Sequence, residues 1–508
     1  MLTNVLDYLD RSVTLYPEKI ALSDSKNEAT YAEFGEKSDA IGSAIIERSG
    51  TKNSPIVVFI DRNIESVISF MGIAKSGNFY VPIDRQLPVK RVELIVETLQ
   101  PKAAIIWDKD NRILDEINFS GERILYEEAI LHKVNADALN AVREKSIDTD
   151  PLYAIFTSGS TGVPKGVLVC HRSVIDLIEN FAETFDFDDT RVFGNQAPFD
   201  FDVSVKDIYS CIRNGGSMHV IPKLFFSFPA KLIACINERK INTIIWATSA
   251  LRIIENLNAL EKTLPETLKT IMFSGEVMPN KVLNYWRNKL PDVSYVNLYG
   301  PTEITCNCLY YKVDRPFNDE DALPIGVAFK NTDILLLDGD NLITEPGIKG
   351  EICVRGTSLA HGYYNNHEKT AEAFCQNPLN KAYPELIYRT GDLAKYGEDG
   401  LIYFVSRKDY QIKHMGHRIE LSEVEIAINS LPYIDAGCCI YDKTNEQIVL
   451  FYQSANECER DIMKDGTKLL PKYMMPNRFI HFTELPMTKN AKIDRVKLKG
   501  EYLDNDKD

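Results

Sequence analysis

The sequence has no surplus of basic residues, because 73 aspartates and glutamates outnumber 58 lysines and arginines and give a formal net charge of −15. A general nucleic-acid binder has the opposite balance, so we expect no nucleic-acid partner. No run of 18 apolar residues occurs, which predicts that the chain does not span a membrane. The N-terminal segment lacks the basic and apolar regions of a signal peptide, so we expect a cytoplasmic protein.

Cysteine pairs with metal-binding spacing are also missing. The chain has ten cysteines, but none form a C-x-x-C pair. Cys306 and Cys308 are separated by one residue, Cys438 and Cys439 are adjacent, and neither spacing fits a zinc framework. We therefore interpret the cysteines as reduced, mostly buried thiols.

Short apolar segments rich in β-branched residues alternate with segments of helical length. A strand expected at 56–60 is followed by a helix at 64–75 and a strand at 80–83, and a helix at 89–99 and a strand at 103–107 repeat the order. This order predicts an α/β fold of layered, mostly parallel sheets with flanking helices. Further strands are expected at 153–157, 217–221, 243–246, 270–273 and 294–298.

Beyond Gly391 the predicted elements become shorter and fewer. We expect a helix over 422–429, begun by a capping box in which Ser422 is the N-cap and Glu425 its partner. Strands are expected at 401–405, 411–413, 436–441 and 448–452. The change predicts a large N-terminal domain of residues 1–408 and a small α+β domain of residues 409–508.

A glycine- and hydroxyl-rich decapeptide, T-S-G-S-T-G-V-P-K-G at 157–166, follows the strand expected at 153–157. Glycines let backbone N–H groups approach phosphates, and Lys165 can neutralise phosphate charge. Gly166 follows Lys165, so the segment is not G-x-x-x-x-G-K-S/T, and the dinucleotide pattern G-x-G-x-x-G is also missing. By itself, such a segment is also typical of a flexible surface loop.

This decapeptide resembles the phosphate loop of the adenylate-forming superfamily, which includes acyl-CoA synthetases, luciferases and the adenylation domains of nonribosomal peptide synthetases. Further segments resemble that family's motifs in the family's order. They are N-L-Y-G-P-T-E at 297–303, Y-R-T-G-D at 388–392, S-R-K-D-Y-Q-I-K at 406–413 with G-H-R-I-E-L at 416–421, and L-P-M-T-K-N-A-K-I-D-R at 485–495. The family usually has glycine where Ala491 stands.

The resemblance implies ATP and Mg²⁺ as cofactors. It also implies a mechanism in which cations offset the repulsion between a carboxylate and the α-phosphate. The implied catalytic residues are Lys492, Lys165, Thr302 and Glu303, with Glu303 as the magnesium ligand. The implied nucleotide-binding residues are Thr157, Ser158, Gly159, Ser160, Thr161, Gly162, Gly275, Glu276, Leu298, Tyr299, Gly300, Asp392 and Arg407.

Individual roles follow from side-chain chemistry within that resemblance. Tyr299 offers a flat face to adenine, and Asp392 and Arg407 can bind the ribose hydroxyls. Asp409 is the implied hinge, about which the small domain would rotate between two successive reactions. Taken alone, Asp392 is typical of a turn, Lys492 of a solvated surface and Glu303 of the first turn of a helix.

The segment P-F-D-F-D-V-S-V-K at 198–206 resembles the amino-acid-activating branch, in which Asp202 would bind the substrate's amino group. The alternative is an ion pair between Asp202 and Lys206. The implied substrate-binding residues are Asp202, Val203, Lys206, Ile245, Met272, Ser274, Leu298, Cys306 and Asn307.

Several of these side chains are bulky, which favours a small substrate. The segment F-S-G-E-V-M-P at 273–279 also resembles D-alanine–carrier-protein ligases. Lys206 would pair with an acidic substrate if it points inward and would be unremarkable if it points outward. D-alanine, β-alanine, L-serine and an acidic amino acid therefore all stay open.

We predict an AMP-forming ligase of nonribosomal-peptide type. It would activate a small amino acid and transfer it to the phosphopantetheine thiol of a separate carrier protein. Residues 493–508 are too few for a carrier domain, so the acceptor would be another chain or coenzyme A. The alternatives are a ligase of simple carboxylic acids to coenzyme A and a catalytically degenerate scaffold.

Overall fold

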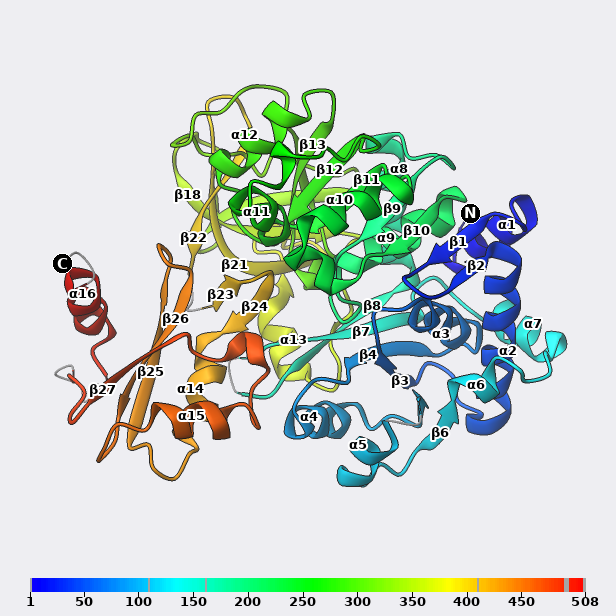
Figure 1. Ribbon diagram of the computed structural model, residues 1–508, viewed down its shortest axis with the longest axis horizontal. Helices are drawn as coiled ribbons and strands as arrows, with labels where there is room; N and C mark the ends of the chain where they lie inside the picture. Colours follow the sequence, from blue (N-terminus) through cyan, green and yellow to red (C-terminus); the bar gives the residue numbers. More distant parts are fainter. Residues whose placement is uncertain (1, 108–109, 160–161, 409–410, 488–492, 506–508) are drawn as a thin grey trace. The chain divides into compact units, whose positions relative to one another are not determined.

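The computed structural model describes residues 2–107, 110–159, 162–408, 411–487 and 493–505 (Figure 1). Its contacts divide the chain into two compact units. The first comprises Met1–Arg85, Leu99–Ile155 and Gly166–Lys408, and the second comprises Gln86–Thr98, Phe156–Lys165 and Asp409–Asp508. Two segments from the N-terminal part of the chain, including the glycine-rich loop, thus group with the C-terminal residues.

A largely parallel sheet forms the centre of the first unit. Strand β11 lies next to β9 and β12, and all three run parallel to one another. Antiparallel strands complete its two edges. Within the described residues its order is β15 (Val327–Ala328), β14 (Leu309–Lys312), β13 (Ser294–Tyr299), β12 (Thr270–Ser274), β11 (Thr243–Ala247), β9 (Val192–Asn195), β10 (Ser217–Val220), β1 (Ile20–Ser23) and β2 (Glu28–Thr30).

A second sheet contains the parallel strands expected near the N-terminus. Strands β3, β4, β5, β6 and β7 pair in parallel, as alternation with helices predicts. Its order is β19 (Gly362–Tyr363), β8 (Lys165–Cys170), β7 (Pro151–Thr157), β4 (Phe79–Asp84), β3 (Pro55–Ile60), β5 (Ala103–Ile106) and β6 (Glu122–Leu125).

Helices of the first unit connect these strands, and several begin at side-chain caps. The predicted helix over 64–75 is α3, whose N-cap Asn63 accepts a hydrogen bond from the Ser66 backbone N–H at 3.1 Å. The helices are α1 (Leu6–Leu15), α2 (Tyr31–Ser49), α3 (Ile64–Lys75), α5 (Asn111–Glu116), α6 (Tyr126–Ala129), α7 (Ala136–Glu144), α8 (His171–Phe185), α9 (Val203–Asn214), α10 (Pro229–Glu238), α11 (Thr248–Asn256), α12 (Asn280–Lys289) and α13 (His367–Ala373), with 3-10 turns η2 (Lys223–Ser227), η3 (Ala259–Glu261) and η4 (Thr302–Ile304).

A third, antiparallel sheet completes the first unit, and the apolar pattern of the sequence predicts no strands in most of it. Antiparallel strands bury one face, so their apolar signal is weaker than that of strands buried on both faces. The strands are β17 (Asn341–Leu342), β16 (Thr332–Asp338), β18 (Lys349–Gly356), β21 (Leu386–Tyr396), β20 (Phe374–Gln376) and β22 (Ile402–Arg407), which pairs with β21.

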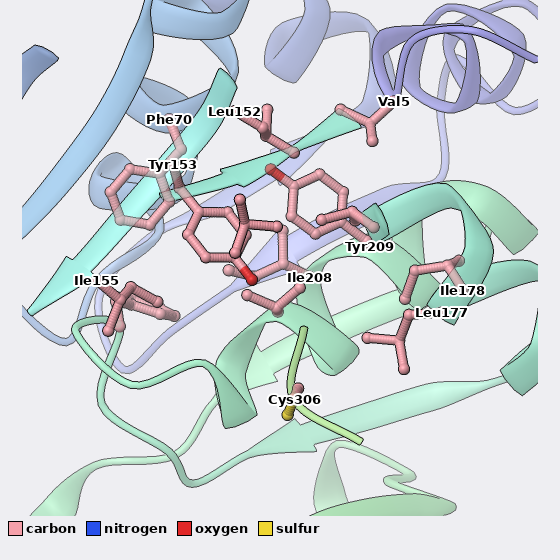
Figure 2. Packing of buried hydrophobic residues seen from close by; sticks show 14 of the residues in the cluster. Val5, Phe70, Leu152, Tyr153, Ile155, Leu177, Ile178, Ile208, Tyr209 and Cys306 are labelled. Carbon is pink, nitrogen blue, oxygen red and sulfur yellow. The ribbon is translucent and has the colours of Figure 1, made fainter. Parts of the chain in front are cut away.

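One apolar core joins the three sheets of the first unit. Met272 of the first sheet, Ile56 of the second and Ile352 of the third belong to the same buried cluster. Figure 2 shows part of this cluster, in which Tyr153 and Tyr209 lie among aliphatic side chains. The core therefore fixes the edge of the first sheet against residues supplied by β7.

The second unit is a smaller α+β assembly. A hairpin of β23 and β24 precedes α14, and β25, β26 and β27 form a separate sheet. The elements are α4 (Val89–Leu99), β23 (Gln411–His414), β24 (His417–Glu420), α14 (Leu421–Asn429), β25 (Ala436–Asp442), β26 (Gln447–Gln453), α15 (Glu459–Gly466), η5 (Lys472–Met474), β27 (Arg478–Phe482) and α16 (Arg495–Asn505).

The predicted capping box of Ser422 and Glu425 is wrong. Helix α14 begins at Leu421, so Ser422 lies within its first turn and Glu420 is the N-cap residue. The Glu425 carboxylate instead accepts a hydrogen bond from the Cys439 backbone N–H at 2.6 Å and pairs with Arg495 at 2.6 Å. The Glu425 carboxylate, which the local sequence predicts as a cap, therefore binds residues far along the chain.

The ten cysteines form no disulfide and are buried or half-buried, as their spacing predicts. Across the described ranges, no helix combines the length and apolar character that a membrane crossing needs.

Candidate active site

Three neighbouring strands of the first sheet end at one edge. Strands β11, β12 and β13 run parallel, with Ile245 beside Met272. In open α/β sheets, ligands bind outside the carboxyl ends of such strands. The residues at this edge include Ser274, which ends β12, and Tyr299, which ends β13. Predicted substrate-binding and nucleotide-binding residues are therefore neighbours on the same strands.

Tyr299, Asp392 and Arg407 form a hydrogen-bonded cluster from three strands. The Tyr299 hydroxyl donates to Asp392 Oδ2 at 2.5 Å, and Arg407 Nη1 lies 2.6 Å from Asp392 Oδ1. Asp392 faces Arg407 in the register of β21 and β22. Burial, and then the Asp392 charge, raise the pKa of Tyr299 well above its usual value, so the phenol stays a donor. The cluster presents a fixed carboxylate and guanidinium suited to a ribose.

Glycines shape the turns beside this cluster. A Cβ on Gly300 would lie 2.6 Å from both the Asn307 Cα and the Cys306 carbonyl oxygen, so a side chain does not fit there. Gly275 follows β12 with φ of +98°, a conformation that favours glycine. The backbone carbonyl of the next residue, Glu276, accepts a hydrogen bond from the Thr248 hydroxyl at 3.2 Å. These turns bring backbone close to the strand ends.

Glu303 is fully buried beside the same edge, in turn η4 after Thr302. The Tyr363 hydroxyl donates to Glu303 Oε1 at 2.8 Å. Among the described residues, no group of three or more acidic, histidine or cysteine side chains is arranged to hold a metal by itself. One carboxylate with a neighbouring hydroxyl nevertheless fits Mg²⁺, which keeps water and phosphate oxygens as most of its ligands. Glu303 and Thr302 would hold such an ion, which neutralises phosphate charge when bound.

Asp202 lies at the N-terminus of α9, as its N-cap residue, and is 9% exposed. Its side chain makes no capping hydrogen bond. Its charge helps to raise the pKa values of Tyr153 and Cys306, after the larger effect of burial, so the carboxylate lies near both groups. A buried carboxylate in this place suits a cationic ligand group.

Lys206 points inward, which answers the question left open by the sequence. The side chain is fully buried, and Nζ donates to Asn307 Oδ1 at 2.9 Å and to Ser274 Oγ at 3.4 Å. Lys206 of α9 therefore contacts two other residues of the predicted substrate set, one from β12 and one from the turn after η4.

Apolar side chains form the wall around these polar groups. Ile245, Met272, Leu298 and Cys306 are buried and belong to one cluster, whereas Val203 is half-buried. Burial raises the pKa of the Cys306 thiol to about 12, so this cysteine is neutral. That the substrate is small stays a prediction.

Two buried polar groups near this wall have no sequence motif. The Tyr153 hydroxyl has no hydrogen-bond partner among the described residues. Asp207, next to Lys206, accepts a hydrogen bond from Asn195 Nδ2 at 2.9 Å, and burial raises its pKa to about 7. Charges at Lys206 and Arg62 act in the opposite direction on the Asp207 pKa. The signal in the sequence is the adjacent charged pair Lys206 and Asp207, which stands between the apolar residues Val205 and Ile208.

The described part of the glycine-rich loop makes its contacts within the second unit. Ser158 Oγ donates to the Arg418 carbonyl at 2.8 Å and accepts from the Glu420 backbone N–H at 3.1 Å. The Gly159 N–H donates to the Glu423 carboxylate at 3.1 Å, which also pairs with Arg91. Burial raises the Glu423 pKa, and Arg91 opposes this shift. The Gly159 N–H of this loop thus binds a carboxylate oxygen, and phosphate binding needs backbone donors of this kind.

The remaining predicted site residues have the following positions. Thr157 ends β7, and its hydroxyl has no partner among the described residues. Gly162 has φ of +81°, and Lys165 begins β8. Ser160, Thr161, Asp409 and Lys492 lie outside the described residues.

Comparison with known proteins identifies the class that this fold and site define. Residues 9–364 match the family model of the AMP-binding enzymes, and the chain belongs to that family. It is thus an adenylate-forming enzyme of a family of AMP-forming ligases that use ATP and Mg²⁺. The resemblance found in the sequence is confirmed.

Particular relatives cover nearly the whole chain. The D-alanine–D-alanyl carrier protein ligases of Bacillus licheniformis and Bacillus cereus are 30% and 32% identical, over 98% of this chain and 99% of theirs. Tyrocidine synthase 1 of Brevibacillus parabrevis is 29% identical over 95% of this chain, which spans 44% of that protein's length. The adenylation domain AlmE of Vibrio cholerae, solved with glycyl-adenosine-5'-phosphate, shares the fold with a TM-score of 0.85, 19% identity and coverage of 99% and 98% of the two chains.

Proposed function

We propose that this enzyme activates a small amino acid as its aminoacyl-adenylate and transfers it to the phosphopantetheine thiol of a separate carrier protein. One observation carries the proposal. Strands β12 and β13 supply the residues assigned to the amino acid, Ser274 and Leu298, directly before those assigned to the nucleotide, Gly275 and Tyr299. The full-length similarity to D-alanine–D-alanyl carrier protein ligases supports the choice of an amino acid and a carrier.

In the first step, an oxygen of the amino acid carboxylate attacks the α-phosphorus of ATP. A new P–O bond forms, the bond to the bridging oxygen breaks, and pyrophosphate leaves. Asp202 would hold the substrate ammonium, and Asp392 with Arg407 would hold the ribose in the hydrogen-bonded arrangement described above. Lys492 would stabilise negative charge as it develops on the phosphate.

In the second step, the carrier's thiolate attacks the acyl carbon, a C–S bond forms, the bond between the acyl carbon and the phosphate oxygen breaks, and AMP leaves. The first step needs Lys492 at the phosphate, whereas the second needs access for a thiol. We propose that the domain of residues 409–508 reorients about Asp409 between the two steps, while residues 1–408 keep the adenylate bound. The cytoplasmic location stays a prediction.

Amino-acid-dependent exchange of labelled pyrophosphate into ATP tests the first step. We expect exchange with at least one amino acid, followed by loading of a phosphopantetheinylated carrier protein, seen as a mass increase that hydroxylamine removes. Exchange with no amino acid would contradict the proposal. Tight ATP binding without pyrophosphate release would instead favour a degenerate scaffold.

Asp202 distinguishes this function from the ligation of simple acids to coenzyme A. Replacement Asp202→Ala removes the carboxylate proposed to bind the ammonium, and we expect kcat/KM for the amino acid to fall by about 100-fold. The matched variant Asp189→Ala lies on the connection between α8 and β9 and should have no effect. The wild type is also tested with acids that lack the amino group. If these acids support pyrophosphate exchange at the same rate as the amino acids do, the coenzyme A alternative gains support.

A further inference from the structure

Lys206 is a buried cation with neutral contacts. Its ammonium donates to the Asn307 amide oxygen and the Ser274 hydroxyl, and it also interacts with the Cys306 thiol. Neither hydrogen-bond acceptor, the Ser274 hydroxyl or the Asn307 amide oxygen, carries a charge. A buried ammonium costs several kcal/mol unless an anion compensates it. The protein therefore keeps a positive charge in the interior with amide, hydroxyl and thiol neighbours.

The nearest carboxyl group along the helix does not supply that compensation by contact. Asp207 accepts a hydrogen bond from Asn195, and its charge interacts with Arg62. Burial raises the pKa of Asp207 to about 7, and the charge of Lys206 opposes this shift. Asp207 therefore interacts with Lys206 through its charge, while its hydrogen bond goes to Asn195.

Asp202 and Lys206 are four residues apart at the start of α9, so they share one face of the helix. Such positions have Cβ atoms roughly 5–6 Å apart. A single small molecule can therefore contact a carboxylate and an ammonium along one helical turn. The ligand that matches this pair carries an ammonium at one end and a carboxylate at the other, in addition to the carboxylate that reacts.

The buried Tyr153 hydroxyl supplies a second, independent sign of a ligand. It is fully buried and has no hydrogen-bond partner among the described residues, although a buried hydroxyl usually has one. It lies near Asp202, whose charge raises the pKa of Tyr153 in addition to the larger effect of burial. Figure 2 shows Tyr153 in the same buried cluster as Cys306. A polar ligand beside Asp202 would satisfy this hydroxyl.

We infer that the amino acid activated here has an acidic side chain, as aspartate and glutamate do, and that Lys206 pairs with its side-chain carboxylate. This inference rests on the proposed function, because it names the substrate class for the same site. Asn307 and Ser274 position the ammonium by accepting hydrogen bonds from two of its three hydrogens. The Cys306 thiol is a weak acceptor, so the third hydrogen can bond to the carboxylate of the ligand. Neutral amino acids leave the cation uncompensated and are the poorer substrates.

The first test is a pyrophosphate-exchange panel with the full chain. It compares D- and L-aspartate and D- and L-glutamate with their amides, and with glycine, L-serine, β-alanine and both alanines. We expect an acidic amino acid to exceed its own amide by about 100-fold in kcat/KM, because the amide leaves a buried charge unpaired. A neutral amino acid as the best substrate overturns this inference and leaves amino acid activation intact. Exchange with no amino acid overturns the proposed function and this inference together.

The second test changes the charge of Lys206 with little change in volume. In Lys206→Met we expect the kcat/KM for the acidic substrate to fall by about 100-fold, while the ratio of amide to acid rises by at least tenfold. Lys330→Met removes an exposed lysine that pairs with Glu183 on the surface, and it should behave as wild type. Circular dichroism and the affinity for ATP check that both variants are folded. Equal loss for acid and amide in a folded Lys206→Met shows a purely structural lysine and overturns the inference.

Discussion

Tyr299 and Asp392 lie 93 residues apart in the chain, yet the Tyr299 hydroxyl donates to Asp392 Oδ2 at 2.5 Å. Arg407 binds the other carboxylate oxygen at 2.6 Å, so both oxygens of Asp392 are held. The tyrosine was predicted to contact adenine with its ring. Its hydroxyl in addition orients the carboxylate assigned to the ribose.

Tyr299→Phe tests this orienting contact. The change removes one hydrogen bond to a buried carboxylate and keeps the ring, so we expect the KM for ATP to rise about tenfold with a smaller change in kcat. Tyr311→Phe is the matched control. Tyr311 lies on the neighbouring strand β14, and its hydroxyl donates a similar hydrogen bond to Asp314 at 2.6 Å. Equal effects of the two variants on the KM for ATP would show that the contact contributes to folding alone.

Glu303→Gln tests the assigned magnesium ligand. Glutamine can still accept the hydrogen bond from Tyr363, but it lacks the charge that a hard divalent cation prefers. We expect pyrophosphate exchange to fall by about 100-fold and half-maximal activity to need more Mg²⁺. Titration with Mg²⁺ provides the measurement. The control is Glu385→Gln, which changes a carboxylate paired with Arg355. An unchanged Mg²⁺ requirement in Glu303→Gln argues against the assignment.

Lys492→Ala separates the two half-reactions. Because Lys492 is assigned to the charge that develops at the phosphate, we expect exchange to fall by about 100- to 1,000-fold. Thioester formation from a supplied aminoacyl-adenylate should remain within a few-fold of wild type. Lys497→Ala, at an exposed position in α16, serves as the control. Parallel loss of both half-reactions contradicts a reorientation between two steps.

His171 should make stability depend on pH. It begins α8, is buried, and accepts a hydrogen bond from the Val5 backbone N–H at 3.3 Å. Burial lowers its pKa from 6.5 to about 3, so the unfolded chain binds a proton at a higher pH than the folded one. Stability from this group is therefore complete above pH 6.5 and is lost as pH falls towards 3, at about 1.4 kcal/mol per pH unit.

Urea unfolding at pH values from 7 to 4 measures this slope. His171→Asn keeps an acceptor for the Val5 N–H and removes the titrating ring, so the loss of stability per pH unit should decrease by about 1.4 kcal/mol. His367→Asn, at the exposed start of α13, is the control. The same slope in wild type and His171→Asn would disprove the assignment.

Much of the fold could be predicted from local pattern. The helices over 64–75 and 89–99 have the predicted bounds, and the strand expected at 56–60 is extended by one residue. Continuous apolar strands give strong signals because both faces are buried. Most of the antiparallel sheet from β16 to β22 was not predicted, because half-exposed strands give weaker apolar signals in the sequence. Helix α14 does not begin at the predicted capping box, because the Glu425 carboxylate binds Cys439 and Arg495, which lie far along the sequence.

The candidate site divides in a similar way. The order of the motifs predicts site roles for Tyr299, Asp392 and Glu303, and the structure brings Tyr299 and Asp392 into contact. Tyr153 lies outside any motif and resembles an ordinary core tyrosine in the sequence. Its position beside Asp202 depends on packing between β7 and the edge of the first sheet.

The sequence by itself determined the α/β class, the adenylate-forming chemistry and the residues assigned to the nucleotide, since each follows from short-range pattern. Tertiary structure decided the direction of Lys206, which could have faced water or the interior. Its partner Asn307 is 101 residues away, and α9, β12 and the turn after η4 must pack together before that hydrogen bond exists. Side-chain direction depends on such distant neighbours, because a helix residue gains its partners from whichever elements pack on its face.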